Sequence, residues 1–137
     1  MSRRTGSSAA VLVLAMLAAP AGSCETLSAY SGAQLFERFC TSCHGSRGEG
    51  DGPVAPFFKL TPPDLTRIAH RHGGEFPTEQ VRKIIDGRSG LPPHGSRTMP
   101  VWGVEFLVAE GTTPEGRARA ETLITRLVEY LRSIQAR

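Results

Sequence analysis

The sequence has few aromatic residues, few cysteines, no long hydrophobic run and no strong excess of charge of one sign. Of its 137 residues, 7% are aromatic and 39% hydrophobic, which suits one small domain and is too apolar for a wholly disordered chain. The apolar run over residues 9–19 holds 11 residues, too few to cross a bilayer as a helix, so a polytopic membrane protein is excluded. The three cysteines cannot all pair within one molecule, so at least one has a role outside a disulfide framework.

The first residues have the order of features of a secretory signal. Arg3 and Arg4 give a positive start, residues 9–19 form an apolar core, and small residues suited to cleavage follow. A buried helix of the folded domain is the alternative. We predict a signal peptide over 1–23, a single domain over 24–137, and export to the periplasm. Without Arg3 and Arg4, 14 Lys and Arg stand against 13 Asp and Glu, and the net charge falls from +3 to +1. A nearly neutral protein with interleaved charges gives no indication of nucleic-acid binding.

Cys24 stands where the lipidated cysteine of a bacterial lipoprotein would stand. The small residues Ala21, Gly22 and Ser23 precede it, although lipoprotein signals usually carry Leu where Ala21 stands. An unpaired thiol is a liability in an oxidising compartment, which favours lipidation. Ordinary cleavage nearby would instead leave Cys24 as a terminal thiol. A lipid anchor at Cys24 and a periplasmic protein without an anchor both stay open.

The chemistry of the chain is concentrated in the motif Cys40-x-x-Cys43-His44, which is the motif for covalent haem attachment. On a helical turn, residues three apart share a face, so both sulfurs can reach the two vinyl groups of one porphyrin edge. His44 follows at once and is placed to bind the iron as the proximal ligand. We therefore predict one haem c, attached through Cys40 and Cys43.

Three other readings of this motif compete. A structural zinc site needs two further ligands, for which His70 and His72 are available, but it gains nothing from a histidine that adjoins the cysteine pair. A thioredoxin-like pair needs a βαβ context, which the surrounding residues do not indicate. A local disulfide between Cys40 and Cys43 leaves His44 unexplained.

The second axial position of the iron is predicted to be occupied by Met99. Met1 and Met16 leave with the signal, so Met99 is the only methionine of the mature chain, on a turn-rich stretch stiffened by Pro100. Met paired with His is a known haem ligand set, whereas the commoner role of a lone methionine is to fill a core. His94, five residues earlier, is the rival ligand, and we expect His70 and His72 to be solvated.

With Cys40-x-x-Cys43-His44 and Met99-Pro100-x-Trp102-Gly103, the chain resembles class I c-type cytochromes over Tyr30–Gln135. The likeness is greatest to small exported bacterial monohaem cytochromes, and extends to the monohaem subunits that accompany respiratory oxidases and periplasmic dehydrogenases. The resemblance implies that the carbonyl of Pro53 accepts the Nδ1–H of His44, which would fix the ring and tune the iron.

The helical pattern around these motifs predicts an all-α fold. Ser31 with Gln34 forms a capping box for a first helix, and Thr112 with Glu115 resembles another, with Pro114 at the first helical position. A stripe at helical spacing marks the core face of the last helix: Ala120, Leu123, Ile124, Leu127, Leu131 and Ile134.

Between the terminal helices we expect a short helix within 64–73, capped by Asp64 and ended by Gly73, and a middle helix over 78–87. The family resemblance implies that the terminal helices cross, with Gly32, Phe36 and Tyr130 at the crossing, and that loops wrap the haem.

These observations predict an electron carrier that is not an enzyme by itself. It would cycle Fe(II)/Fe(III) between a donor, a dehydrogenase or quinol-cytochrome c reductase, and an acceptor oxidase or reductase, as a monomer or a complex subunit. The alternatives are a gas sensor or minor peroxidase with an open or labile sixth position, and a permanent subunit of an oxidase or dehydrogenase complex. Arg97 could pair with a haem propionate or be solvated, and 104–111 could be a docking element or a connector.

Overall fold

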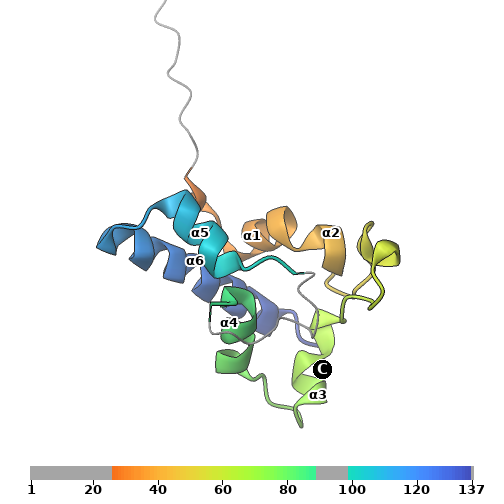
Figure 1. Ribbon diagram of the computed structural model, residues 1–137. Coiled ribbons are helices and arrows are strands. Elements are labelled where there is room, and N and C mark those ends of the chain that lie inside the picture. The colour runs from red at the N-terminus through yellow and green to blue at the C-terminus, as the bar shows by residue number, and fades with distance from the viewer. Residues whose placement is uncertain (1–25, 89–98, 137) are drawn as a thin grey trace, which may run out of the picture.

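The computed structural model describes residues 26–88 and 99–136, which are all helix, turn and loop with no strand in those ranges. The predicted signal and Cys24, together with His94 and Arg97, lie outside the described residues. The helices are, in order, η1 (Leu27–Ala29), α1 (Gly32–Phe39), α2 (Thr41–His44), η2 (Ala55–Phe57), η3 (Leu65–Arg67), α3 (Ile68–Arg71), α4 (Thr78–Asp86), α5 (Trp102–Glu110) and α6 (Pro114–Ser133). This arrangement confirms the all-α prediction (Figure 1).

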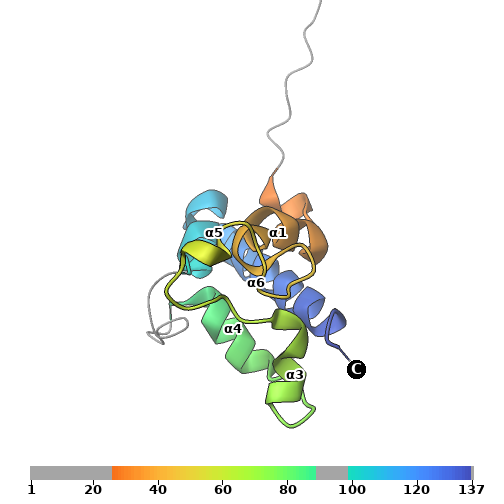
Figure 2. The ribbon, with the colours of Figure 1, turned by 90° about the vertical axis from the view of Figure 1, so that its right-hand side faces the viewer.

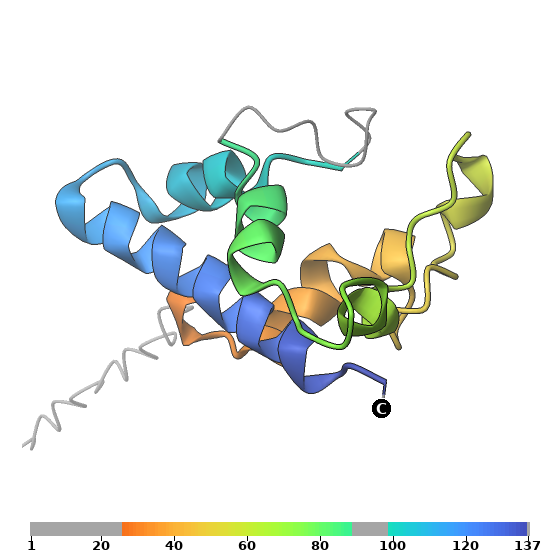
Figure 3. The same cartoon turned by 90° about the horizontal axis from the view of Figure 1, so that it is seen from below.

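The long helix α6 carries the core, and α1, α4 and α5 pack against it (Figure 3). All predicted stripe residues of α6 up to Leu131 are buried, while Ile134 is half-buried just beyond the helix end. One cluster of buried side chains joins the four helices and α3: Leu35, Phe36, Ile68, Val81, Ile85, Phe106, Ala120, Leu123, Ile124, Leu127, Val128 and Leu131.

The start of α6 differs by one residue from the prediction. The N-cap is Thr113, whose hydroxyl accepts a hydrogen bond from the Gly116 amide at 3.1 Å, so the predicted cap by Thr112 with Glu115 is wrong. Pro114 does occupy the first helical turn. Thr112 and Thr113 are adjacent, and the sequence favoured Thr112 only through its spacing to Glu115. The cap is the threonine whose hydroxyl faces the free amides at the helix end, which is Thr113.

The crossing of α1 and α6 follows the expectation. Ser31 caps α1 in a full capping box with Gln34. The rings of Phe36 and Tyr130 pack with their centroids 5.1 Å apart. A Cβ at Gly32 would lie 2.9 Å from the Cβ of Tyr130, so only a glycine lets the two helix backbones approach this closely.

The middle helices also appear where predicted. Asp64 accepts a hydrogen bond from the Thr66 amide at 2.8 Å and begins η3, which continues into α3. The next helix, α4, ends at Asp86, and Gly87 turns the chain in the left-handed conformation with φ 64°. Figure 2 shows α3 and α4 together on one side of the molecule, with α1 and α5 on the other.

The segment 104–111, for which the sequence indicated either a docking element or a connector, belongs mostly to α5. This helix is apolar on almost every side, so it has no stripe by which periodicity could identify it. Phe106 is buried against α6, and the rings of Phe39, Trp102 and Phe106 form a cluster with centroids 5.2 to 5.8 Å apart. Among the described residues, no helix is long and apolar enough to span a membrane.

Candidate functional site

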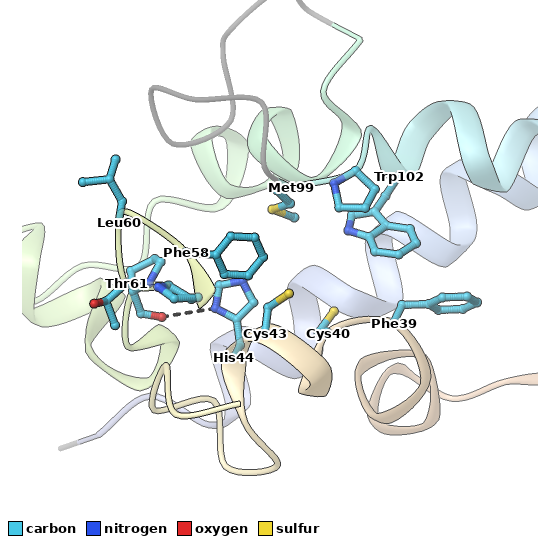
Figure 4. A pocket seen from close by; sticks show the side chains of 12 residues that line it. Phe39, Cys40, Cys43, His44, Phe58, Leu60, Thr61, Met99 and Trp102 are labelled. Atoms are coloured by element: carbon cyan, nitrogen blue, oxygen red, sulfur yellow. Dashed lines mark hydrogen bonds between the residues drawn. The ribbon is translucent and has the colours of Figure 1, made fainter. Parts of the chain in front are cut away.

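The turn between α1 and α2 brings Cys40, Cys43 and His44 to one place. Cys40 ends α1, and its carbonyl accepts hydrogen bonds from the amides of Cys43 at 3.2 Å and His44 at 2.9 Å. This single helical turn sets the two sulfurs beside each other, and both point into the same cavity (Figure 4). Both cysteines are free thiols.

Burial keeps the Cys40 thiol protonated. Desolvation, with a smaller contribution from the neighbouring Cys43, raises the pKa of Cys40 from 9.0 to about 12. A redox-active thiol of the thioredoxin kind needs a lowered pKa, because the thiolate is the attacking species. Cys40 therefore has the opposite electrostatics from those of a dithiol oxidoreductase.

The imidazole of His44 is buried, with 6% of the residue exposed. Its Nδ1 lies 3.2 Å from the carbonyl oxygen of Pro63, and its other ring nitrogen points into the cavity (Figure 4). A bond of this kind fixes the tautomer and the orientation of a ligand imidazole. The structure thus supplies the second contact expected of an iron-binding histidine.

The acceptor of that bond corrects the prediction for Pro53. The residues beside Pro53 are held along α2, since Gly52 donates to the Cys43 carbonyl at 3.2 Å and Val54 to the Ser42 carbonyl at 3.1 Å. Pro53 is exposed there, and the role expected of it falls to Pro63.

The glycine-rich loop explains why Pro63 can take this place. A Cβ at Gly50, where φ is 85°, would lie 3.3 Å from the carbonyl carbons of both Pro62 and Pro63, so the loop and the proline pair pack backbone to backbone. Leu65 then donates to the Gly48 carbonyl at 2.6 Å and fastens the return of the chain. In the sequence, the adjacent prolines Pro62 and Pro63 indicate a stiff segment. Their distance from His44 along the chain does not by itself indicate that they contact it.

A hollow opens above the two sulfurs and the imidazole. It comprises a cavity of about 240 Å³ and a smaller one of about 70 Å³, which share the wall residues Cys40, His44, Pro63, Met99 and Trp102. Met99 lies across the hollow from His44 (Figure 4). The structure therefore brings four of the five predicted site residues together and leaves Pro53 outside.

Most of the remaining wall is apolar. The larger cavity is lined by aliphatic side chains of α3, α4 and α6, among which Ile84 is half-buried, and by three polar side chains, Arg71, His72 and Gln80. His72 is exposed, and its Nδ1 lies 2.9 Å from the Ile68 carbonyl oxygen. His70 is exposed and does not line either cavity. No cluster of three or more His, Cys, Asp or Glu side chains that could hold a metal ion occurs within 26–88 and 99–136.

The donor set fits a covalently attached haem. Two adjacent thiols can form thioethers on one edge of the ring, a nitrogen and a thioether sulfur face each other across the hollow, and an apolar wall suits the porphyrin faces. The three polar side chains of the larger cavity suit the propionates of such a ring.

Comparison with known proteins agrees with this fit. Neither the curated proteins nor the solved structures contain a match to the chain. The family model for cytochrome c matches residues 29–135, which include every described residue of the site. The chain belongs to the cytochrome c family, whose members carry a covalently bound haem and transfer electrons.

Proposed function

We propose that this chain is a periplasmic one-electron carrier with a single haem c, bound axially by His44 and Met99. The observation that carries the proposal is the position of Met99 across the hollow from His44. A second protein ligand closes the iron to small molecules, which suits electron transfer better than gas binding or peroxide chemistry.

Each residue of the site has a defined role in this proposal. The bound haem supplies the reversible Fe(II)/Fe(III) couple. Cys40 and Cys43 hold the ring by thioether bonds, and the soft sulfur of Met99 favours the reduced iron, so the midpoint potential lies above that of a bis-histidine site. The Pro63 carbonyl orients His44 and makes the imidazole a stronger donor.

The surface beside the hollow supports a transient redox partner. Leu60 lines the smaller cavity and is 65% exposed, and Phe57, on the same segment, is 85% exposed. Redox partners use small interfaces that form and separate quickly. A donor dehydrogenase or quinol-cytochrome c reductase and an acceptor oxidase or reductase fit this description, with the chain acting as a free carrier or as a subunit of a larger complex.

The proposed location rests on the predicted signal over 1–23. Mass spectrometry of the mature N-terminus tests both export and the anchor. A diacylglyceryl mass on Cys24 would establish a lipid anchor, cleavage without that mass would give a soluble periplasmic protein, and an intact residue 1 would contradict export.

Absorption spectra of the haem-loaded protein test the axial ligands. We expect the ferric wild type to show the weak long-wavelength band of Met–Fe(III) ligation and the ferrous form to bind carbon monoxide only very slowly, after Met99 has left the iron. Met99→Ala should lose the band and bind the gas, because one axial position is then open. Wild-type protein that binds carbon monoxide readily would contradict Met99 ligation and favour the sensor or peroxidase alternative.

A further inference from the structure

The two ends of the segment that carries Met99 lie side by side. The chain leaves α4 through Asp86 and Gly87 and returns through Val101 into α5. A Cβ at Gly87 would lie 3.0 Å from Cγ1 of Val101, and a Cβ at Gly103 would lie 2.6 Å from the Asp86 carbonyl oxygen and overlap the Asp86 carboxylate. The end of α4 and the start of α5 are neighbours in Figure 3 as well.

Arg88 joins this junction to α6. Its Nε donates to Oδ1 of Asp86 at 2.5 Å, and its Nη2 donates to Oε1 of Glu121. A Cβ at Gly103 would also lie 2.7 Å from the Arg88 Nε, so the guanidinium rests directly on the first turn of α5. One side chain therefore contacts the end of α4, the start of α5 and the middle of α6.

A second arginine, Arg82, holds the Glu121 carboxylate in place. Arg82, on α4, lies with its Nη1 3.9 Å from Oε2 of Glu121, and its Nη2 donates to the Thr125 hydroxyl at 2.8 Å. The carboxylate of Glu121 thus forms ion pairs with two arginines at once. A network of this kind is worth more than an isolated surface pair, because its members hold one another in position.

We propose that Arg88, bound between Asp86 and Glu121, is a positioning residue for Met99. Met99 lies only two residues before Val101, so a fixed junction limits how far its thioether can move from the hollow. A neutral thioether is a weak ligand whose occupancy depends on its local concentration at the iron, and that concentration falls as the ends of its segment become freer. This inference rests on the proposed function, because it requires Met99 to be an axial ligand.

The test uses the haem-loaded wild type with the variants Arg88→Gln and Glu121→Gln. The control is Arg119→Gln, which removes two hydrogen bonds to Glu110 at the opposite end of α5, from Nε to Oε2 (2.7 Å) and from Nη2 to the carbonyl oxygen (2.8 Å). Two readouts follow Met99: the rate at which carbon monoxide binds ferrous protein, and the pH at which the Met–Fe(III) band is lost.

We expect Arg88→Gln and Glu121→Gln to bind carbon monoxide about threefold to tenfold faster than wild type and to lose the band at lower pH. An effect of this size matches the loss of about one surface ion-pair network. The control should behave as wild type in both readouts. The double variant Arg88→Gln/Glu121→Gln should show an effect smaller than the product of the two single effects, because the contact between Arg88 and Glu121 is already lost in each single variant.

Salt gives an independent check. The side chains of Arg88 and Glu121 are 31% and 51% exposed, so salt screens their attraction. Carbon monoxide binding by the wild type should therefore speed up as ionic strength rises, while binding by Arg88→Gln should respond little.

The outcomes separate the two proposals. If the wild type itself lacks the band or binds carbon monoxide freely, Met99 ligation fails. If the wild type shows the band and binds carbon monoxide slowly, while Arg88→Gln and Glu121→Gln match Arg119→Gln, the role of Arg88 is wrong and the axial assignment stands. Circular dichroism checks that every variant keeps the helix content of the wild type. If a variant loses helix, Arg88→Lys takes its place in the test, because lysine keeps the charge without the forked geometry of the guanidinium.

Discussion

At the scale of single residues, the contact between His44 and Pro63 decides how the proximal ligand is held. The sequence places His44 through its motif, but the partner of its Nδ1 comes from 19 residues further along the chain. The family resemblance implied Pro53, but the folding of the glycine-rich loop against Pro62 and Pro63 brings the Pro63 carbonyl to His44 instead.

The contact between His44 and Pro63 affects the midpoint potential of the haem. A carbonyl that accepts the Nδ1–H of His44 increases the donor strength of the imidazole and so favours Fe(III). Pro63→Ala frees the backbone dihedral at the acceptor and weakens the bond, so we expect a higher midpoint potential in a redox titration. Pro53→Ala is the matched control and should leave the potential unchanged. A shift in the control that equals the shift in Pro63→Ala would restore Pro53 as a partner.

At the scale of elements, the crossing of α1 and α6 depends on a missing side chain. The carbonyl of Arg126 and the Cβ of Tyr130 occupy the place where a side chain at Gly32 would begin. Arg126 in turn donates to the carbonyls of Ser28 and Tyr30 at 2.7 and 2.8 Å and ties the chain before α1 to α6.

A methyl group at this crossing should separate the helices. We expect Gly32→Ala to lower the free energy of unfolding by about 1–3 kcal/mol, the usual cost of overpacking, although alanine is the better helix former. Chemical denaturation of the haem-loaded protein measures the effect. Ala33→Gly, on the exposed side of the same turn, is the control and should cost about 1 kcal/mol or less through helix propensity alone. Gly32→Ala with unchanged or increased stability would contradict the close crossing.

At the scale of the whole molecule, the hollow replaces the centre of an ordinary core. The buried cluster includes residues of α1, α4, α5 and α6, and the wall of the larger cavity includes Leu127 and Leu131 from the same cluster. The haem is therefore expected to complete the core as well as to carry the electron.

Removal of haem should leave little stability. Without haem, the apolar side chains around the larger cavity of about 240 Å³ lose their packing partner, and a small domain has only a few kcal/mol of stability to lose. We expect the chain produced without haem to lose its cooperative thermal transition, or to melt far below the haem-loaded form, when both are followed by circular dichroism at one pH and salt concentration. Equal melting temperatures would show that the helices are stable without a filled hollow.

The sequence by itself determined the local features. The motif Cys40-x-x-Cys43-His44 lies within one helical turn, the capping box of Ser31 needs only residues three apart, and the stripe of α6 repeats along a single helix. Each depends on interactions between near neighbours, which a linear pattern records directly.

The tertiary structure decided three features that the sequence did not indicate. It selected Pro63 over Pro53, made a helix of an evenly apolar stretch by burying Phe106, and set Arg88 between α4, α5 and α6. The physical reason is the same in each case. The energy of these contacts depends on which surfaces meet after the chain has turned back on itself, and no repeat or spacing along the chain encodes that meeting.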